Sequence, residues 1–146
     1  MQSELTSFQI KVLDVLKAFD SFCKQNSLTY YASCGTLLGV VRHKGFIPWD
    51  DDVDVWMTRK EYNKFLSLKY KLEGSEYRIG SIEDDNYPYE FAKFFSTNGT
   101  LQEYEHFRFL TGPWVDVFPL NECEVEDPDY DRALENLNYA HWRYRK

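Results

Sequence analysis

The sequence predicts an α/β domain in which a small mixed β-sheet is flanked by helices. Two observations indicate this fold class. Apolar residues recur at three- or four-residue steps over residues 3–25 and 59–72, which is the spacing of amphipathic helices. Apolar and polar residues alternate over 52–57 and 113–120, as they do in half-buried strands. Because both periods occur within 146 residues, we expect a single domain over residues 1–146.

Composition limits the class of protein. The chain is 43% hydrophobic and 18% aromatic, which is ample material for a buried core. Its net charge of −7 argues against a binder of nucleic acids or of anionic membranes. Three cysteines without a Cys-x-x-Cys pair indicate reduced thiols rather than a disulfide framework or a zinc site. Since neither a signal peptide nor a membrane span is visible, we expect a cytoplasmic protein.

The first helix is expected over residues 3–25, a short strand over 28–32, and a turn with a short helix over 33–43. In that turn, Gly35 and Thr36 offer close backbone approach, a hydroxyl group and free N–H groups. Together these groups can hold a phosphate. The alternative is that the glycine serves the turn for steric reasons alone.

The middle of the chain should alternate between helix and strand. Thr58 and Glu61 have the spacing of a capping box, which predicts a helix over 59–72 that Gly74 ends. A strand is then expected over 77–82.

A hairpin is predicted next. Its first strand covers 89–96, the pair Asn98-Gly99 forms the turn, and 100–110 forms the partner strand. Lys93 lies in this hairpin as a candidate phosphate contact, and the alternative is an exposed lysine without a role. After a further strand at 113–120, a last helix is expected from residue 127 to the end of the chain.

Four carboxylates fall within residues 50–54, and this cluster is the strongest functional signal. The alternation places Asp52 and Asp54 on one strand face, about 7 Å apart. Such a pair can bind one or two divalent cations, and without a cation each carboxylate raises the pKa of the other. Asp116 is a lone carboxylate in the later strand and needs a partner or a cation. We interpret it as the third acid of the same site.

Two other interpretations of the cluster are disfavoured. A solvated charge run does not fit the apolar flanks, among them Trp49, which we expect in the core. A calcium loop counted from Asp50 would place acids at positions one, three, five and twelve. However, its sixth position is Val55 instead of glycine, and Pro48 prevents the incoming helix.

Four motifs follow one another along the chain: Gly35-Thr36-Leu37-Leu38-Gly39, Arg42-His43, Phe46-Ile47-Pro48-Trp49-Asp50-Asp51-Asp52-Val53-Asp54, and Trp114-Val115-Asp116-Val117-Phe118-Pro119-Leu120. In this order they resemble the LicD family, with which fukutin-type transferases share the pattern. The resemblance covers residues 30–120 and implies a nucleotidyltransferase-like fold.

The resemblance also implies an activity. LicD proteins typically transfer phosphocholine from CDP-choline to a hydroxyl of a cell-surface glycan, such as lipopolysaccharide or teichoic acid, and release CMP. Fukutin-type relatives transfer ribitol phosphate from CDP-ribitol. The alternatives are transfer of a nucleoside monophosphate, and a truncated non-catalytic module that binds a nucleotide. Family members are usually longer after the third acid, so we expect an oligomer or a partner chain to complete the acceptor site.

The resemblance assigns roles to individual acids. Asp52 and Asp54 match the metal-binding pair, and Asp116 matches the third acidic residue, as a metal ligand or as the general base. The implied cofactor is Mg²⁺ or Mn²⁺. Asp50 and Asp51 would orient the metal ligands without binding the metal themselves.

The remaining candidate residues concern the donor phosphates. Gly35 and Thr36 match the Gly-Ser or Gly-Thr turn of the wider fold, and Arg42 matches the basic residue before the acid motif. Its guanidinium group suits a bidentate phosphate contact. His43 and Lys93 complete the predicted phosphate-binding set.

Overall fold

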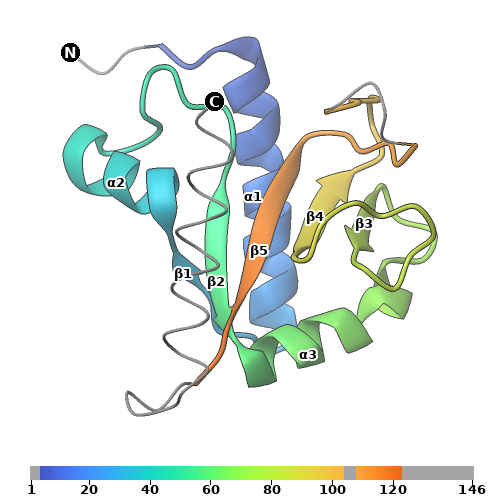
Figure 1. Cartoon of the computed structure of the whole chain (residues 1–146). Coiled ribbons are helices and arrows are strands. Elements are labelled where there is room, and N and C mark those ends of the chain that lie inside the picture. The colour runs from blue at the N-terminus through green and yellow to red at the C-terminus, as the bar shows by residue number, and fades with distance from the viewer. Residues whose placement is uncertain (1–3, 104–107, 123–146) are drawn as a thin grey trace, which may run out of the picture.

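A computed structural model describes residues 4–103 and 108–122, which form a five-stranded mixed sheet with helices packed around it (Figure 1). The elements in chain order are α1 (Ser7–Gln25), β1 (Tyr31–Ala32), α2 (Cys34–His43), β2 (Asp54–Thr58), α3 (Arg59–Ser67), the 3-10 helix η1 (Lys69–Leu72), β3 (Tyr77–Gly80), β4 (Ala92–Ser96) and β5 (Trp114–Leu120). The predicted fold class is confirmed. No helix in the described part is both long and apolar enough to cross a bilayer.

The sheet has the strand order β1-β2-β5-β4-β3. Strands β2 and β5 are parallel, whereas the other neighbouring pairs are antiparallel. In this register Asp54 is paired with Asp116, and Asp116 is paired with Lys93 on its other side. Because side chains alternate along a strand, these three residues lie on one face of the sheet and their apolar neighbours lie on the other.

The apolar face forms the core, which α1 covers from behind the sheet (Figure 1). Phe19 of α1 is fully buried, and its ring lies 4.9 to 5.8 Å, between centroids, from those of Tyr30, Phe65 and Phe94. Edge-to-face contacts of this kind add to the free energy gained by burying the rings. The core therefore joins α1 to α3 and β4 and leaves the opposite face of the sheet to the carboxylates.

The first turn of α1 is tied to the acidic segment. Thr6 caps the helix, since its side chain accepts a hydrogen bond from the backbone N–H of Gln9 at 3.1 Å, and the side-chain oxygen of Gln9 accepts one from the backbone N–H of Thr6 at 2.9 Å. This capping box starts the helix at Ser7, later than the predicted start. The side chain of Gln9 is buried, and its amide nitrogen Nε2 donates to the backbone carbonyl oxygens of Ile47 at 3.3 Å and Asp50 at 2.7 Å.

Several predicted boundaries differ from the structure. The strand expected over 28–32 is confined to β1, the one over 77–82 ends at Gly80, and the one over 89–96 begins at Ala92. The helix expected over 59–72 divides into α3 and η1. The helix predicted from residue 127 lies outside the described residues.

The capping box predicted at the start of α3 is only half formed. The hydroxyl of Thr58 accepts from the backbone of Glu61 at 3.4 Å. The carboxylate of Glu61, however, accepts from the backbone of Thr29 at 3.1 Å. A backbone donor from a distant segment thus takes the place of the local one.

The predicted hairpin after β4 is wrong. Strand β4 is hydrogen-bonded to β3 along one edge and to β5 along the other, so no edge remains for a partner strand at 100–110. Within the described part of that segment, Leu101 forms an isolated bridge with Thr111. The chain bends at the Asn98-Gly99 pair, with Gly99 at a φ of +110°, and leaves the sheet there instead of forming the predicted hairpin turn.

Gly39 of α2 lies in close contact with the chain after the helix, and this packing should outweigh the higher helix propensity of alanine at that position. A Cβ atom at Gly39 of α2 would lie 2.5 Å from the carbonyl oxygen of Gly45, whereas a Cβ at Gly45 would meet nothing within 4 Å. Alanine is favoured over glycine in helices by about 1 kcal/mol. We nevertheless expect Gly39→Ala to lower the free energy of unfolding by about 1–3 kcal/mol, because the contact is with backbone. Urea denaturation measures this change.

Gly45→Ala is the matched control and should change the free energy of unfolding by less than about 1 kcal/mol. Stabilisation by Gly39→Ala would contradict the close approach of α2 to the segment that follows it.

Candidate metal centre

Three carboxylates converge on the face of the sheet opposite the core. Asp54 is the first residue of β2, and Asp116 is paired with it in β5. Asp52 lies two residues before Asp54 in the chain. One oxygen from each carboxylate lies within 4.8 Å of those of the other two. The structure therefore brings together all three acids predicted as metal ligands. Asp52 itself lies outside the strand, although the expected alternation of buried and exposed positions holds from Asp52 to Thr58.

This proximity has an electrostatic cost. Burial and the neighbouring carboxylates, chiefly Asp50, raise the pKa of Asp52 to about 6. Burial, Asp52 and Asp116 raise the pKa of Asp54 to about 7. The pKa of Asp116 is also raised by burial, although the ammonium group of Lys93 opposes the shift. The centre thus favours the addition of positive charge, in the form of protons or a cation.

The donor set is suited to a hard divalent cation. Its three ligand groups are all carboxylates, and Mg²⁺ and Mn²⁺ prefer oxygen ligands. The thiol of Cys34, at the start of α2, has a pKa raised by desolvation and by the negative charges of Asp54 and Asp52. A neutral thiol is a poor metal ligand. The residues present therefore fit Mg²⁺ or Mn²⁺ better than a thiophilic metal.

The Gly35-Thr36 turn supports the acidic segment directly. The hydroxyl of Thr36 accepts a hydrogen bond from the backbone N–H of Asp54 at 2.9 Å. A Cβ atom at Gly35 would lie 2.5 Å from the carboxylate of Asp50, so glycine allows that carboxylate to approach the start of α2. The structure thus gives both residues a role in positioning the acids, and their phosphate contact stays a prediction.

A pocket of about 670 Å³ lies beside the carboxylates, between α1, α2 and the acidic segment. Its wall includes Gly35, Thr36, His43, Asp50 and Asp52, and apolar side chains of α1, of α2 and of the segment that leads into β2 form much of the rest. Four of the predicted site residues therefore share one cavity, which is within the size range of small-molecule sites.

Arg42 and Trp49 are placed differently from these residues. Arg42 is exposed in the last turn of α2 and is not among the described residues that line the pocket. The expectation that Trp49 belongs to the core is wrong, since it is 83% exposed and its ring lies 6.4 Å from that of His43. The predicted phosphate contact of Arg42 remains a prediction.

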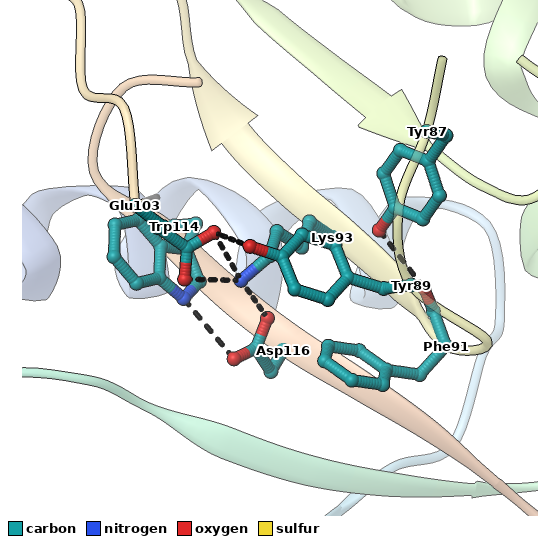
Figure 2. A network of polar contacts seen from close by, with 7 residues as sticks. All are labelled: Tyr87, Tyr89, Phe91, Lys93, Glu103, Trp114 and Asp116. Atoms are coloured by element: carbon teal, nitrogen blue, oxygen red, sulfur yellow. Dashed lines mark hydrogen bonds and ion pairs between the residues drawn. The ribbon is translucent and has the colours of Figure 1, made fainter. Parts of the chain in front are cut away.

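Lys93 is buried in a polar network on β4 and β5, as Figure 2 shows. Its ammonium nitrogen lies 2.7 Å from Oδ1 of Asp116 and 3.2 Å from a carboxylate oxygen of Glu103. The indole N–H of Trp114 donates to Oδ2 of Asp116 at 3.1 Å, and the hydroxyl of Tyr89 contacts Glu103. The alternative of an exposed lysine without a role is therefore wrong.

The contributions of Trp114 and Glu103 were not predicted from the sequence. The alternation over residues 113–120 places Trp114 on the same strand face as Asp116, two residues away, and this spacing is the available signal for their contact. Glu103 was assigned to a partner strand that does not form. Its approach to Lys93 depends on the path of the chain after β4, which local periodicity does not encode.

A family model described as LicD/FKTN/FKRP, nucleotidyltransferase domain, matches residues 27–129. This range contains the complete carboxylate centre, the Gly35-Thr36 turn and the Lys93 network.

Individual relatives match this chain over different lengths and at different sequence identities. Over 89 residues the chain is 40% identical to lipopolysaccharide cholinephosphotransferase LicD of Haemophilus influenzae, covering 60% of this chain and 34% of that protein. It is 35% identical over 70 residues to an uncharacterised protein of Rickettsia prowazekii, covering 48% and 26%. It is 24% identical over 133 residues to Mannosyltransferase regulator 4 of Saccharomyces cerevisiae, covering 84% and 11%. The chain therefore spans about a third or less of these relatives' lengths.

The raised pKa values predict how the stability of the metal-free protein depends on pH. Since an unfolded aspartate has a pKa of about 3.9, the folded state binds more protons than the unfolded state between about pH 4 and 7. The stability that protonation of Asp52 and Asp54 gives the folded state is therefore lost as pH rises through this window. In EDTA, we expect Asp54→Asn to raise Tm relative to the unchanged chain, by an amount that grows from pH 4 to pH 7. Calorimetric scans measure this difference.

Asp14→Asn is the control, because Asp14 is an exposed residue of α1 that pairs with Lys17. This variant should show no such growth in its Tm difference. A difference between Asp54→Asn and the unchanged chain that shrinks as pH rises would contradict the destabilising role of the charged cluster.

Proposed function

The chain belongs to the LicD family, and on this premise we propose that it transfers phosphocholine, or a similar phospho-alcohol, from a CDP-activated donor to a cell-surface glycan. An acceptor hydroxyl of lipopolysaccharide or teichoic acid type would attack the phosphorus of the transferred group. The bond from that phosphorus to the CMP oxygen breaks, CMP leaves, and the hydroxyl proton passes to a base. The observation that carries the proposal is the convergence of three carboxylates within 4.8 Å beside a pocket.

Asp52, Asp54 and Asp116 are the residues that would hold Mg²⁺ or Mn²⁺. When bound, the ion would neutralise charge on the donor diphosphate and lower the pKa of the attacking hydroxyl. Asp116 has two candidate roles, either as the third ligand or as the general base for the acceptor proton. Its hydrogen bonds from Lys93 and Trp114 support the role of ligand, because both stabilise the ionised carboxylate.

The pocket beside the carboxylates supports binding of the donor. Gly35 and Thr36 lie in the first turn of α2, where backbone N–H groups and the helix dipole favour phosphate. His43 on the same wall can donate a further hydrogen bond. A contact from Arg42 would require the donor to extend beyond the pocket. We further propose that an oligomer or a partner chain completes the acceptor site, and that the reaction takes place in the cytoplasm.

Product analysis tests the reaction. With CDP-choline, Mg²⁺ and a glycan acceptor, the chain should release CMP and label the glycan with phosphocholine. Asp52→Asn and Asp54→Asn should each lower kcat/KM by about a hundredfold or more, because each removes a ligand of an ion that contributes several kcal/mol to the reaction. Chromatography of the nucleotide products measures both effects.

Asp14→Asn should retain the rate of the unchanged chain. Release of pyrophosphate from a nucleoside triphosphate would instead favour transfer of a nucleoside monophosphate. If the chain binds CDP-choline with no turnover under these conditions, the non-catalytic binding module is the better description.

A further inference from the structure

Lys93 stands in a row of charged residues that crosses the sheet. In the register of the strands, Asp54 of β2 is paired with Asp116 of β5, which is paired with Lys93 of β4. All three side chains lie on the face opposite the core. Asp116 therefore has the carboxylate of Asp54 on one side and the ammonium group of Lys93 on the other.

Lys93 is tightly enclosed. Its side chain is 1% exposed, and its ammonium nitrogen lies 4.3 Å from the ring centre of Trp114, 4.5 Å from that of Tyr89 and 5.5 Å from that of Phe91 (Figure 2). A phosphate could reach this nitrogen only by displacing Glu103 or an aromatic ring. A direct phosphate contact is thus a poor use of this side chain.

The network holds both oxygens of Asp116. Lys93 donates to Oδ1 at 2.7 Å, and Trp114 donates to Oδ2 at 3.1 Å. Two donors on opposite oxygens restrain rotation of the carboxylate about its bond to Cβ. Since a carboxylate oxygen accepts more than one interaction, each oxygen retains capacity for a metal ion.

Stability alone does not explain a buried ammonium group at this position. Desolvation of a buried ion pair often cancels its Coulombic attraction, so apolar side chains in place of both the lysine and its acidic partners would serve the fold about as well. What an apolar side chain cannot do is hold Asp116 in one orientation.

We propose that Lys93 is a positioning residue of the metal centre, which holds the Asp116 carboxylate in the orientation that completes the ligand set with Asp52 and Asp54. This inference rests on the metal site of the proposed function and adds a residue to it. Partners of metal-binding side chains typically change metal affinity by about 10- to 100-fold when they are replaced.

The test is the affinity of the chain for Mn²⁺, measured by the electron paramagnetic resonance signal of the free ion. We expect Lys93→Met to weaken Mn²⁺ binding by about 10- to 100-fold. In an Asp116→Asn background, the same substitution should have almost no further effect, because Lys93 acts through Asp116. A further tenfold loss in that background would overturn the proposal.

Lys69→Met is the matched control, since Lys69 also forms a partly buried ion pair, with Asp84 at 2.9 Å, away from the centre. It should leave Mn²⁺ affinity unchanged. Two results for Lys93→Met would overturn the proposal. Unchanged affinity with a lower Tm would show a purely structural lysine. Tighter binding would show that the charge of Lys93 simply repels the ion.

If Lys93→Met does not fold, Lys93→Gln is measured, because its amide keeps a polar group in the network but its side chain ends one bond short of the lysine nitrogen and cannot hold Asp116 in the same way. Weaker Mn²⁺ binding by that variant supports the proposal, and equal or tighter binding overturns it. Absence of Mn²⁺ binding by the unchanged chain overturns it as well.

The transfer assay separates the positioning role of Lys93 from the proposed function. Mn²⁺ binding that depends on Lys93, without turnover, rejects the proposed function alone. Mn²⁺ binding that does not depend on Lys93, with turnover, rejects the positioning role alone.

Discussion

The parallel pairing of β2 with β5 is the constraint on which the candidate site depends. These strands are far apart in the sequence, and their register places Asp54 beside Asp116. A shift of one residue would turn one of the two carboxylates toward the core, because side chains alternate along a strand. The apolar residues that alternate with them, such as Val55 and Val117, therefore set the register by being buried.

The fold accepts an electrostatic cost at this position and compensates for it nearby. The carboxylates repel one another, as the raised pKa values of Asp52 and Asp54 indicate. The buried amide of Gln9 and the hydroxyl of Thr36 bind the backbone of the acidic segment and hold it against α1 and α2. Functional sites commonly retain such locally unfavourable arrangements because the surrounding structure is stable enough to impose them.

The two faces of the sheet have different roles: one forms the hydrophobic core, and the other carries the charged candidate site. One face packs against α1 and α3 through an aromatic and aliphatic core. The other carries the carboxylates and the Lys93 network, and of these acids Asp52 also lines the pocket between α1 and α2. Membership of the LicD family and the geometry of this face both support the reaction that we propose, in which acids, a bound cation and backbone N–H groups would stabilise the charge on a diphosphate.

The sequence by itself determined the local features. The alternation around Asp54 and around Asp116 identified both strands and the face that each acid occupies, and the order of motifs indicated the family. These signals are local, because a period of two or of 3.6 residues is visible within a short window. Only the tertiary structure decided which strands are neighbours. Strand β4 lies between β3 and β5, contrary to the predicted hairpin, and this placement buries Lys93 against Asp116. Strand periodicity specifies a face but not a partner, since pairing depends on how distant segments pack around a shared core.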